Sequence, residues 1–529
     1  MTKIYTYVLL MMGVLAFASC DSFLDEMPDN RAEVDSEYKI QKLLVSAYPG
    51  SSYIMIAETS SDNVDDYGVN NPNTDRFIDE VYHWQDGTED DNESAERLWE
   101  ASYSAIAAAN QVLKSIKDGG LTETNTLKEA KGEALLSRAY NHFILVNFFC
   151  MHYNSATSST DLGIPYMEDV ESTLQPNYVR GNVADVYKKI EKDLLEGLSL
   201  MGESYYEQPK YHFNKKAAYA FAARFYLYYE QWEKARTYAN YVLGTEAKLM
   251  LRDWAYQATM TQEYEAIVNH YIATSLNCNL MLCTAASAVG LAFGPYKYYT
   301  RYSHGAYLAN YETGNAANIW GGNPKNDYYS PMKIYAATNL DRTIFWKLPY
   351  LFEETDPVAQ IGIYRTVYPA FTGDEVLLTR AEANVMLKDY DAACADMTLW
   401  LHNISKNTYV FTPAKVQTFY SGIGYSYDDD DHFLSTVKKH LHPAFAIDAE
   451  NSMQECMLQC VLGLRRIETL QTGLRWFDVK RYGIEIVRRI MDDKGVPVTL
   501  VDVLKKDDKR RAIQIPQKVR SAGIEANPR

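Results

Sequence analysis

The stretches ARFYLYYEQWEKARTYANYVL (Ala223–Leu243) and AEANVMLKDYDAACADMTLWL (Ala381–Leu401) decide the fold of this chain. They align with each other, and Trp232 of the first falls on Tyr390 of the second. Each predicts a helix, a tight turn with an aromatic residue, and a second helix with small residues at the crossing. Alanines at such crossings let two helices approach closely, as in tetratricopeptide-type hairpins. The alignment favours a helical repeat over two unrelated hairpins.

Amphipathic helices extend over much of the rest of the chain. Apolar side chains recur at steps of three and four along Trp99–Lys117, Glu133–Phe149, Tyr187–Met201 and Met453–Ile467. The first two stretches predict another hairpin, while strand-type alternation is scarce. We therefore predict a mostly α protein, in which tetratricopeptide-like helical hairpins form a scaffold and loop-rich inserts carry the ligand-binding site.

The distribution of these patterns predicts one domain, from residue 20 to residue 529. The helical-repeat scaffold is expected at about 90–260 and 375–405, and a further helical part at about 440–529. Between the repeats, a segment at about 278–370 is rich in Gly, Pro and Asn, which favour turns over helices. This segment is predicted to be a loop-rich insert.

The composition excludes several classes of protein. Hydrophobic residues make up 47% of the 529 residues and charged residues 23%, which is typical of a globular chain and not of a disordered one. After the first twenty residues, no run is long and apolar enough to span a bilayer. The formal net charge is -17, so we expect no nucleic-acid partner, because an acidic surface repels a phosphate backbone.

The amino terminus predicts export and lipidation. Residues 1–19 contain Lys3 and a short apolar core, Val8–Phe17, which is the pattern of a signal peptide. The segment ends in Ala18-Ser19-Cys20, which matches the lipobox of bacterial lipoproteins, although Leu usually stands where this chain has Phe17. We predict cleavage before Cys20 and attachment of the lipid to this residue. The alternative is an ordinary signal peptide with an incidental cysteine.

Signatures of catalysis are absent from the sequence. It contains no Walker A loop, GxGxxG, GxSxG or HExxH, so we predict no enzyme and no cofactor. A glycosidase needs only two carboxylates, and the sequence alone leaves that alternative open. The run Asp428–Asp431 suits either a hard cation or a solvated turn, and we favour the turn. A Cys278–Cys283 disulfide also stays open.

The positive signal for ligand binding is an aromatic-rich segment. Phe293–Tyr335 holds eleven aromatic residues in 43, among five Gly, three Pro and five Asn. Exposed aromatic rings suit carbohydrate, because the C–H faces of sugars stack on them. The alternative is that these tyrosines cover the outside of the scaffold. The candidate ligand-binding residues are Trp84, Tyr296, Tyr298, Tyr299, Trp320, Asn323 and Asp327.

The chain also carries an ordered series of family motifs. Its pieces are LWEASYSAIAAANQVL (Leu98–Leu113), KGEALLSRAYNHFILVNFF (Lys131–Phe149), GIPY (Gly163–Tyr166), RGNVADVYKKIEKDL (Arg180–Leu194), EVLLTRAEANVML (Glu375–Leu387) and GLRWFDVKRYG (Gly473–Gly483). With the lipobox and the tail IQIP…ANP, the chain resembles the SusD/RagB family of outer-membrane lipoproteins over nearly its whole length. Cys150 departs from the family, which usually has Gly after NFF. Asp21 stands directly after the cysteine that we predict to be lipidated. In some groups of bacteria, an aspartate at this position retains a lipoprotein in the inner membrane.

The resemblance implies a binding protein that does no chemistry. Family members are anchored by lipid to the outer membrane, face the cell exterior and cap a SusC-like TonB-dependent transporter. They capture oligosaccharides, or peptides in the RagB branch, so an oligosaccharide ligand is the leading interpretation and a peptide ligand the alternative. The resemblance further implies a buried ion pair between Arg475 and Asp478. The ligand residues of the family are not shared motifs, so none is carried over to this chain.

Overall fold

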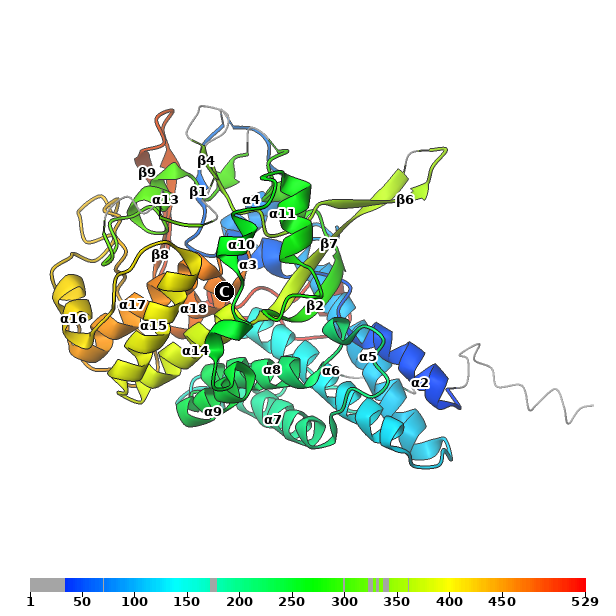
Figure 1. Cartoon of the computed structure of the whole chain (residues 1–529). Coiled ribbons are helices and arrows are strands. Elements are labelled where there is room, and N and C mark those ends of the chain that lie inside the picture. The colour runs from blue at the N-terminus through cyan, green and yellow to red at the C-terminus, as the bar shows by residue number, and fades with distance from the viewer. Residues whose placement is uncertain are drawn as a thin grey trace, which may run out of the picture.

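The computed structural model shows a body built of helices (Figure 1). It describes residues 34–69, 71–171, 178–297, 300–321, 327–329, 333–335, 342–359 and 361–529. The predicted signal peptide and Cys20 lie outside the described residues. The expected mostly α fold is confirmed, and within the described residues no helix is both long and apolar enough to cross a bilayer.

Helices account for most of the regular structure. Their bounds are α2 Glu37–Leu44, α3 Ile54–Ser60, α4 Arg76–Tyr82, α5 Ala95–Asp118, α6 Asn125–Phe149, α7 Val183–Leu200, α8 Lys215–Tyr228, α9 Trp232–Leu243, α10 Trp254–Gln257, α11 Tyr264–Tyr271, α12 Val289–Ala292, α13 Ala306–Tyr311, α14 Gly373–Met386, α15 Tyr390–Ile404, α16 Pro413–Ser421, α17 Met453–Glu468, α18 Leu474–Arg481 and α19 Gln517–Ser521. Many begin at a side-chain cap, as where Ser94 Oγ accepts the backbone N–H of Arg97 and Thr372 Oγ1 that of Glu375. Such caps satisfy backbone donors that a helix start leaves unpaired.

The two predicted repeat hairpins are α8–α9 and α14–α15, and their turns are alike. Glu230 and Lys388 occupy equivalent places, and both have a left-handed backbone, with φ of 59° and 61°. In each turn the next backbone N–H donates across the turn, from Gln231 to Tyr226 O at 2.9 Å and from Asp389 to Asn384 O at 2.8 Å. The same turn geometry at aligned positions confirms the hairpin repeat.

Small residues hold the scaffold helices together. The alanines of α8, α9, α14 and α15 that face other helices are buried, among them Ala223, Ala235, Ala381 and Ala393. Helices α8, α9, α14 and α15 pack in sequence, and α14 also packs on α17. On the other side, α5, α6 and α7 pack side by side (Figure 1). This arrangement forms a continuous helical layer, as predicted.

The structure also contains strands, which the sequence did not predict. Two of them lie at the two ends of the insert and pair with each other. The bounds of the strands are β1 Asp65–Asp66, β2 Asn279–Ala286, β3 Tyr302–Ser303, β4 Lys333–Tyr335, β5 Arg342–Ile344, β6 Leu351–Asp356, β7 Ile361–Thr372, β8 Ile486–Met491 and β9 Pro497–Leu504. At the two ends of the predicted insert, β2 and β7 pair antiparallel, with Cys283 opposite Tyr368. Strand β6 completes the sheet β2-β7-β6, and the β6–β7 hairpin projects from the body (Figure 1).

The carboxy-terminal part is also less helical than predicted. After α17 and α18 the chain forms the antiparallel pair β8–β9, in which Val487 lies opposite Val503. Strand β8 pairs in turn with the short β1, so the four-stranded sheet has the order β3-β1-β8-β9. Through the pairing of β8 with β1, this sheet connects the carboxy-terminal part of the chain to the amino-terminal part of the described residues.

The prediction that Arg475 and Asp478 pair with each other is wrong, because each forms ion pairs with other residues. Arg475 instead binds Asp62 through two hydrogen bonds, whereas Asp478 accepts from Arg465 and Arg481. All of these side chains are buried. The reason is tertiary packing, because α18 lies against α3 and the segment that follows it.

The six cysteines in the described residues are all free and buried. Cys278 and Cys283 therefore form no disulfide in this structure. Burial raises the pKa of the Cys278 thiol to about 11 and that of Cys283 to about 12. Both are protonated at neutral pH and act as small apolar side chains.

Candidate functional site

A row of aromatic rings is exposed at the base of the β6–β7 hairpin. Tyr296, Tyr350, Tyr364 and Phe352 form this aromatic row, and the ring centroids of successive members lie 6.2, 5.5 and 5.3 Å apart. The exposed fraction is 45% for Tyr296, 39% for Tyr364 and 46% for Phe352. Large aromatic side chains are usually buried, so a contiguous exposed row indicates a binding surface.

The strand register explains why the rings of the hairpin lie together. Phe352 of β6 is directly opposite Tyr364 of β7, and alternate residues of a strand point to the same face. The neighbouring pair on the same face is Glu354, two residues after Phe352, opposite Gly362, two residues before Tyr364. A Cβ atom at Gly362 would lie 2.6 Å from Cζ of Phe352. The ring of Phe352 therefore lies across the glycine, and a side chain at Gly362 would displace it.

A buried tyrosine anchors the other end of the row. Tyr264 of α11 contacts Tyr296 edge-on, with centroids 5.2 Å apart. Its hydroxyl donates to Leu348 O at 2.6 Å and lies 3.1 Å from Gly290 O. Gly290 is in close contact with the chain before β6, since an added Cβ would lie 2.2 Å from Pro349 O. These contacts fix the segments that carry Tyr296 and Tyr350.

The hydroxyl of Tyr296 is held by a neighbouring carboxylate. Tyr296 donates its hydroxyl hydrogen to Glu265 of α11. This hydrogen bond, more than burial, raises the pKa of Tyr296 to about 12, and it lowers the pKa of Glu265. At neutral pH the phenol is therefore uncharged and its ring is oriented by Glu265. An uncharged ring with a fixed face suits stacking against an apolar surface.

A buried carboxylate supports β7 from behind the row. Glu93 lies before α5 and accepts hydrogen bonds from Ser287 Oγ at 3.1 Å and from the backbone N–H of Ala288 at 2.5 Å. Ser287 in turn donates its backbone N–H to Tyr364 O at 3.0 Å. Burial raises the pKa of Glu93 to about 7. The chain Glu93–Ser287–Tyr364 thus connects the scaffold to the aromatic row.

Trp84, a sequence-predicted ligand residue, lies in the core instead of on the surface. Its exposed fraction is 3%, and its Nε1 donates to Ser60 O at 3.0 Å. The guanidinium groups of Arg488 and Arg510 lie 4.2 and 5.4 Å from the ring centroid. The structure contradicts an exposed platform at Trp84, because these cations and α3 cover the indole.

Trp320 is buried as well, with an exposed fraction of 7%. Its ring packs edge-on against Trp400 of α15 and Phe411, at centroid distances of 6.5 and 6.2 Å. The prediction that Trp320 forms an exposed platform is therefore wrong. Asp327 lies nearby in the same loop system, where Asn407 Nδ2 donates both to Trp320 O at 3.2 Å and to Asp327 Oδ2 at 3.1 Å. Trp320 and Asp327 thus connect the insert to the segment that follows α15.

The remaining predicted ligand residues divide into two groups. Tyr298, Tyr299 and Asn323 lie outside the described residues. Tyr296 is exposed and belongs to the aromatic row, although no ligand contact is shown for it. Sequence reasoning missed Phe352 and Tyr364, which lie beyond the segment it singled out. The usable signal was the content of β-branched and aromatic residues in IGIYRTVY (361–368), which is typical of a strand.

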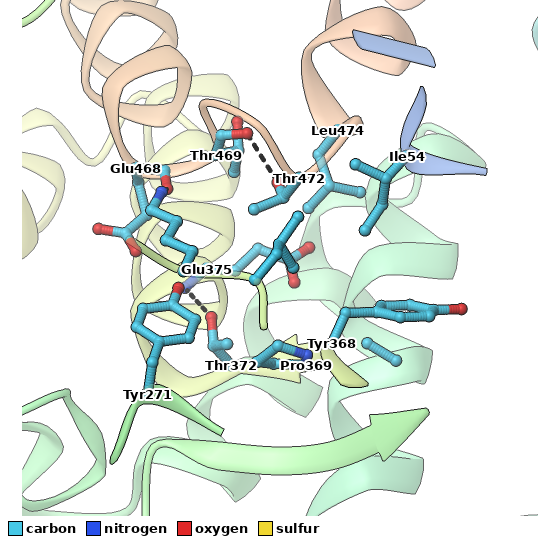
Figure 2. A pocket seen from close by; sticks show the side chains of 13 residues that line it. Ile54, Tyr271, Tyr368, Pro369, Thr372, Glu375, Glu468, Thr469, Thr472 and Leu474 are labelled. Carbon is cyan, nitrogen blue, oxygen red and sulfur yellow. Dashed lines mark hydrogen bonds between the residues drawn. The ribbon is translucent and has the colours of Figure 1, made fainter. Parts of the chain in front are cut away.

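A second feature is an internal cavity between β7, α17 and α18 (Figure 2). Its volume is about 30 Å³, which is close to that of one water molecule and too small for a sugar. The charged groups around it have partners: Glu375 pairs with Arg224, and Lys347 Nζ donates to the carbonyl oxygens of Glu468 and Leu470 at 2.6 and 3.1 Å. The cavity is part of the packed interior.

The acidic run Asp428–Asp431 forms a turn. Asp429 accepts backbone N–H groups of Phe433 and Leu434 at 3.1 and 2.8 Å, and Asp428 lies 2.9 Å from His440 Nε2. Within the described part of the chain, no group of three or more His, Cys, Asp or Glu side chains is arranged to hold a metal ion. Asp429 thus stabilises the local backbone of the turn, and Asp428 interacts with His440.

Comparison with known proteins gives the class of this fold. The family model SusD-like_3, described as "Starch-binding associating with outer membrane", matches residues 22–227. A putative sugar binding protein from Bacteroides vulgatus ATCC 8482 has a TM-score of 0.65 at 17% identity, over 94% of this chain and 99% of its own. A SusD superfamily protein from Bacteroides thetaiotaomicron VPI-5482 has a TM-score of 0.63 at 17% identity, over 93% and 100%.

A third similar structure is a laminarin binding SusD-like protein, with a TM-score of 0.57 at 15% identity over 93% of this chain and 98% of its own. Among curated proteins, none matches this chain in sequence. The three structural likenesses extend over 93–94% of this chain, and the family model covers residues 22–227. The fold is therefore SusD-like, and residues 22–227 match a family model described as starch-binding and associated with the outer membrane.

Proposed function

We propose that this protein is a non-catalytic, lipid-anchored binding protein of the outer membrane that faces the cell exterior. It captures an oligosaccharide on the aromatic row and delivers it to a SusC-like TonB-dependent transporter. The observation that carries the proposal is the exposed row itself, four rings whose successive centroids lie 5.3 to 6.2 Å apart. Sugar rings joined in a chain present successive C–H faces, which such a row can stack against.

The polar surroundings of the row suit hydroxyl groups. Glu353 and Arg365 pair on the opposite face of the β6–β7 hairpin, while Glu354 is exposed on the same face as Phe352. Stacking on an aromatic ring contributes roughly 1–3 kcal/mol per ring by analogy with nucleic-acid bases. Since ordering the ligand offsets much of this energy, we expect a weak to moderate affinity for a single chain.

The anchor and the transporter rest on the sequence and on the family. Cys20 follows a signal-type segment and is the proposed site of the lipid. The matched family is described as associated with the outer membrane, which supports the location. Binding without turnover is supported by the absence of the sequence motifs that mark common hydrolases.

A glycan array tests the ligand class. The chain without its signal peptide is compared with the Phe352→Ala/Tyr364→Ala double variant and with Tyr241→Ala, which removes an exposed ring on α9 outside the row. Laminarin belongs in the panel because one similar structure binds it. Binding that disappears in the double variant and persists in Tyr241→Ala supports the proposal. Binding to oligopeptides but to no glycan would replace it with the peptide alternative.

Two further measurements test the other parts. Incubation of the bound glycan with the protein should produce no new reducing ends. Gentle detergent extraction of the lipidated protein should recover it with one large outer-membrane protein, because a transporter lid buries at least about 1,000 Å² of surface. Recovery of a monomer from cells grown on the bound glycan would contradict the transporter partnership.

A further inference from the structure

Residues 287–290, which follow β2, form a support segment for the aromatic row. Ser287 donates its backbone N–H to Tyr364 O at 3.0 Å. Gly290 lies against the chain before β6, since an added Cβ would be 2.7 Å from the backbone nitrogen of Tyr350. The carbonyl oxygen of Gly290 lies 3.1 Å from the hydroxyl of the buried tyrosine that anchors the other end of the row. The support segment therefore adjoins the row at three places.

The buried side chain of Glu93 fixes the start of the support segment. Its two oxygens accept from separate donors, Oε2 from Ser287 Oγ at 3.1 Å and Oε1 from the backbone N–H of Ala288 at 2.5 Å. Ser287 Oγ itself accepts the backbone N–H of Val289 at 3.2 Å. Hydrogen bonds to an ionised carboxylate are roughly twice as strong as those between neutral groups. The charge of Glu93 therefore orients the support segment.

Protonation of Glu93 changes this pattern of hydrogen bonds. Oε1 faces the backbone N–H of Ala288, which cannot accept a hydrogen bond, so the added proton belongs on Oε2. There it meets the hydroxyl hydrogen of Ser287, which must turn away from Glu93 and lose its acceptor. The protonated form thus holds Ser287, and through it the backbone of Tyr364, less firmly than the ionised form does.

The surroundings of Glu93 allow both forms near neutral pH. Burial raises the pKa of Glu93 to about 7, against the effect of its two hydrogen bonds, and the negative charge of Asp91 raises it further. The adjoining segment 50–52 brings neutral serines, of which Ser51 donates to Asn92 O. Charged side chains of the neighbouring elements are paired elsewhere: Glu96 with Lys518, Arg97 with Glu100, and Arg365 with Glu353.

Stability does not account for a carboxylate at this position. A buried carboxylate is costly unless a cation pairs with it, and in the described part of the chain the charge that acts on Glu93 is the negative one of Asp91. A glutamine would fill the same space without this cost. Carboxylates with shifted pKa values are common at functional sites, and Glu93 lies directly behind the binding surface.

We propose that Glu93 is a positioning residue for the aromatic row, whose ionised form orients the row for the oligosaccharide and whose protonated form weakens binding. This regulation rests on the proposed function, because the ligand is that of the row. Binding and ionisation are linked, so the oligosaccharide in turn favours the ionised form of Glu93. The protein captures its ligand more tightly above pH 7 than in acidic surroundings.

Calorimetric titrations at about pH 5.5 and about pH 8.5, on either side of the pKa of Glu93, test this regulation. The ligand is an oligosaccharide selected on the array with the wild-type protein. We expect the wild type to bind it about fivefold more tightly at the higher pH. In Glu93→Gln, whose amide resembles the protonated acid, binding should stay at the weaker level at both pH values. Glu100→Gln, an exposed carboxylate on α5, is the matched control and should behave as the wild type.

A thermal melt separates positioning from a purely structural role. Glu93→Gln should melt at a higher temperature than the wild type at about pH 8.5 and yet bind more weakly, because it lacks the buried charge. A residue that only stabilises the fold would lose both together. Equal affinity of Glu93→Gln and wild type at about pH 8.5, or equal wild-type affinity at the two pH values, overturns the proposal.

Amide hydrogen exchange tests the same coupling without a ligand. Protection of the Ser287 and Ala288 amides, corrected for the intrinsic effect of pH, should be about fivefold lower at the acidic pH in the wild type and unchanged in Glu93→Gln. If no oligosaccharide binds, the proposed function fails, while a Glu93-dependent difference in protection still supports Glu93 as the positioning residue of the row. Equal protection at both pH values in the wild type overturns that role.

Discussion

Arg475 and Asp62 form a buried two-point ion pair across 413 residues of sequence. Arg475 Nε lies 2.8 Å from Asp62 Oδ1, and Nη2 lies 2.9 Å from Oδ2. Arg466 approaches the same carboxylate at 3.5 Å. The positive charges of Arg466 and Arg475 outweigh the effect of burial and hold the pKa of Asp62 well below its usual range. The pair connects α18, near the carboxy terminus, to the segment after α3, near the start of the described residues.

Removal of this carboxylate should destabilise the protein strongly. In Asp62→Asn, Arg475 and Arg466 stay buried with less compensating charge, a change that costs about 3–5 kcal/mol. The measurement is a urea titration of wild type and variant. Asp448→Asn is the control, because the Asp448–Lys388 pair is exposed and such pairs contribute about 0–1 kcal/mol. An equal loss in both variants would show that the buried pair has no special role.

Glu93 should make the stability depend on pH. Its pKa is about 7 in the folded protein against 4.5 for a solvent-exposed glutamate, so the folded state binds the proton more tightly. This stabilisation is complete below pH 4.5 and declines as the pH rises to about 7. Glu93→Gln cannot ionise, so relative to wild type it should gain about 2–3 kcal/mol between pH 5 and pH 8. Melting temperatures across this range measure the difference, and a pH-independent difference would refute the assignment.

Trp320→Ala should destabilise the fold. The ring is buried against Trp400 and Phe411, and truncation of a buried aromatic costs about 3–5 kcal/mol. Tyr311→Ala is the control, because Tyr311 belongs to the same aromatic-rich segment and is exposed. Thermal melts of both variants provide the comparison. A melting temperature unchanged in Trp320→Ala would show that the ring lies at the surface, as the sequence suggested.

The helical scaffold could be predicted because its signals are local. The crossings of α8–α9 and α14–α15 are encoded by small residues within single stretches such as Ala223–Leu243. The strand β2, NLMLCTAA, was missed because most of its residues are buried on both faces, so it lacks the alternation of a half-exposed strand. Its partner β7 begins only at Ile361, whereas β2 ends at Ala286, and no local pattern reveals a pairing between segments so far apart.

Whether a side chain in a loop is buried or exposed could not be predicted from its neighbours in the sequence. Trp84 and Trp320 both lie in polar segments, which correctly indicates loops but not what packs over the loops. Trp84 is covered by Arg488 and Arg510, and Trp320 by Trp400, all distant in sequence. In the same way, Arg475 has a carboxylate three residues away at Asp478 but pairs with Asp62, because the fold brings Asp62 into position.

The central claim is that the aromatic row binds an oligosaccharide, and calorimetric titration of the Tyr364→Ala variant tests it most directly. The ligand is an oligosaccharide selected on the array with the wild-type protein, and Tyr241→Ala is titrated in parallel. We predict an affinity loss of about tenfold or more in Tyr364→Ala, corresponding to about 1.4 kcal/mol, with no loss in Tyr241→Ala and little change in either melting temperature. An affinity that is unchanged in Tyr364→Ala would contradict the account.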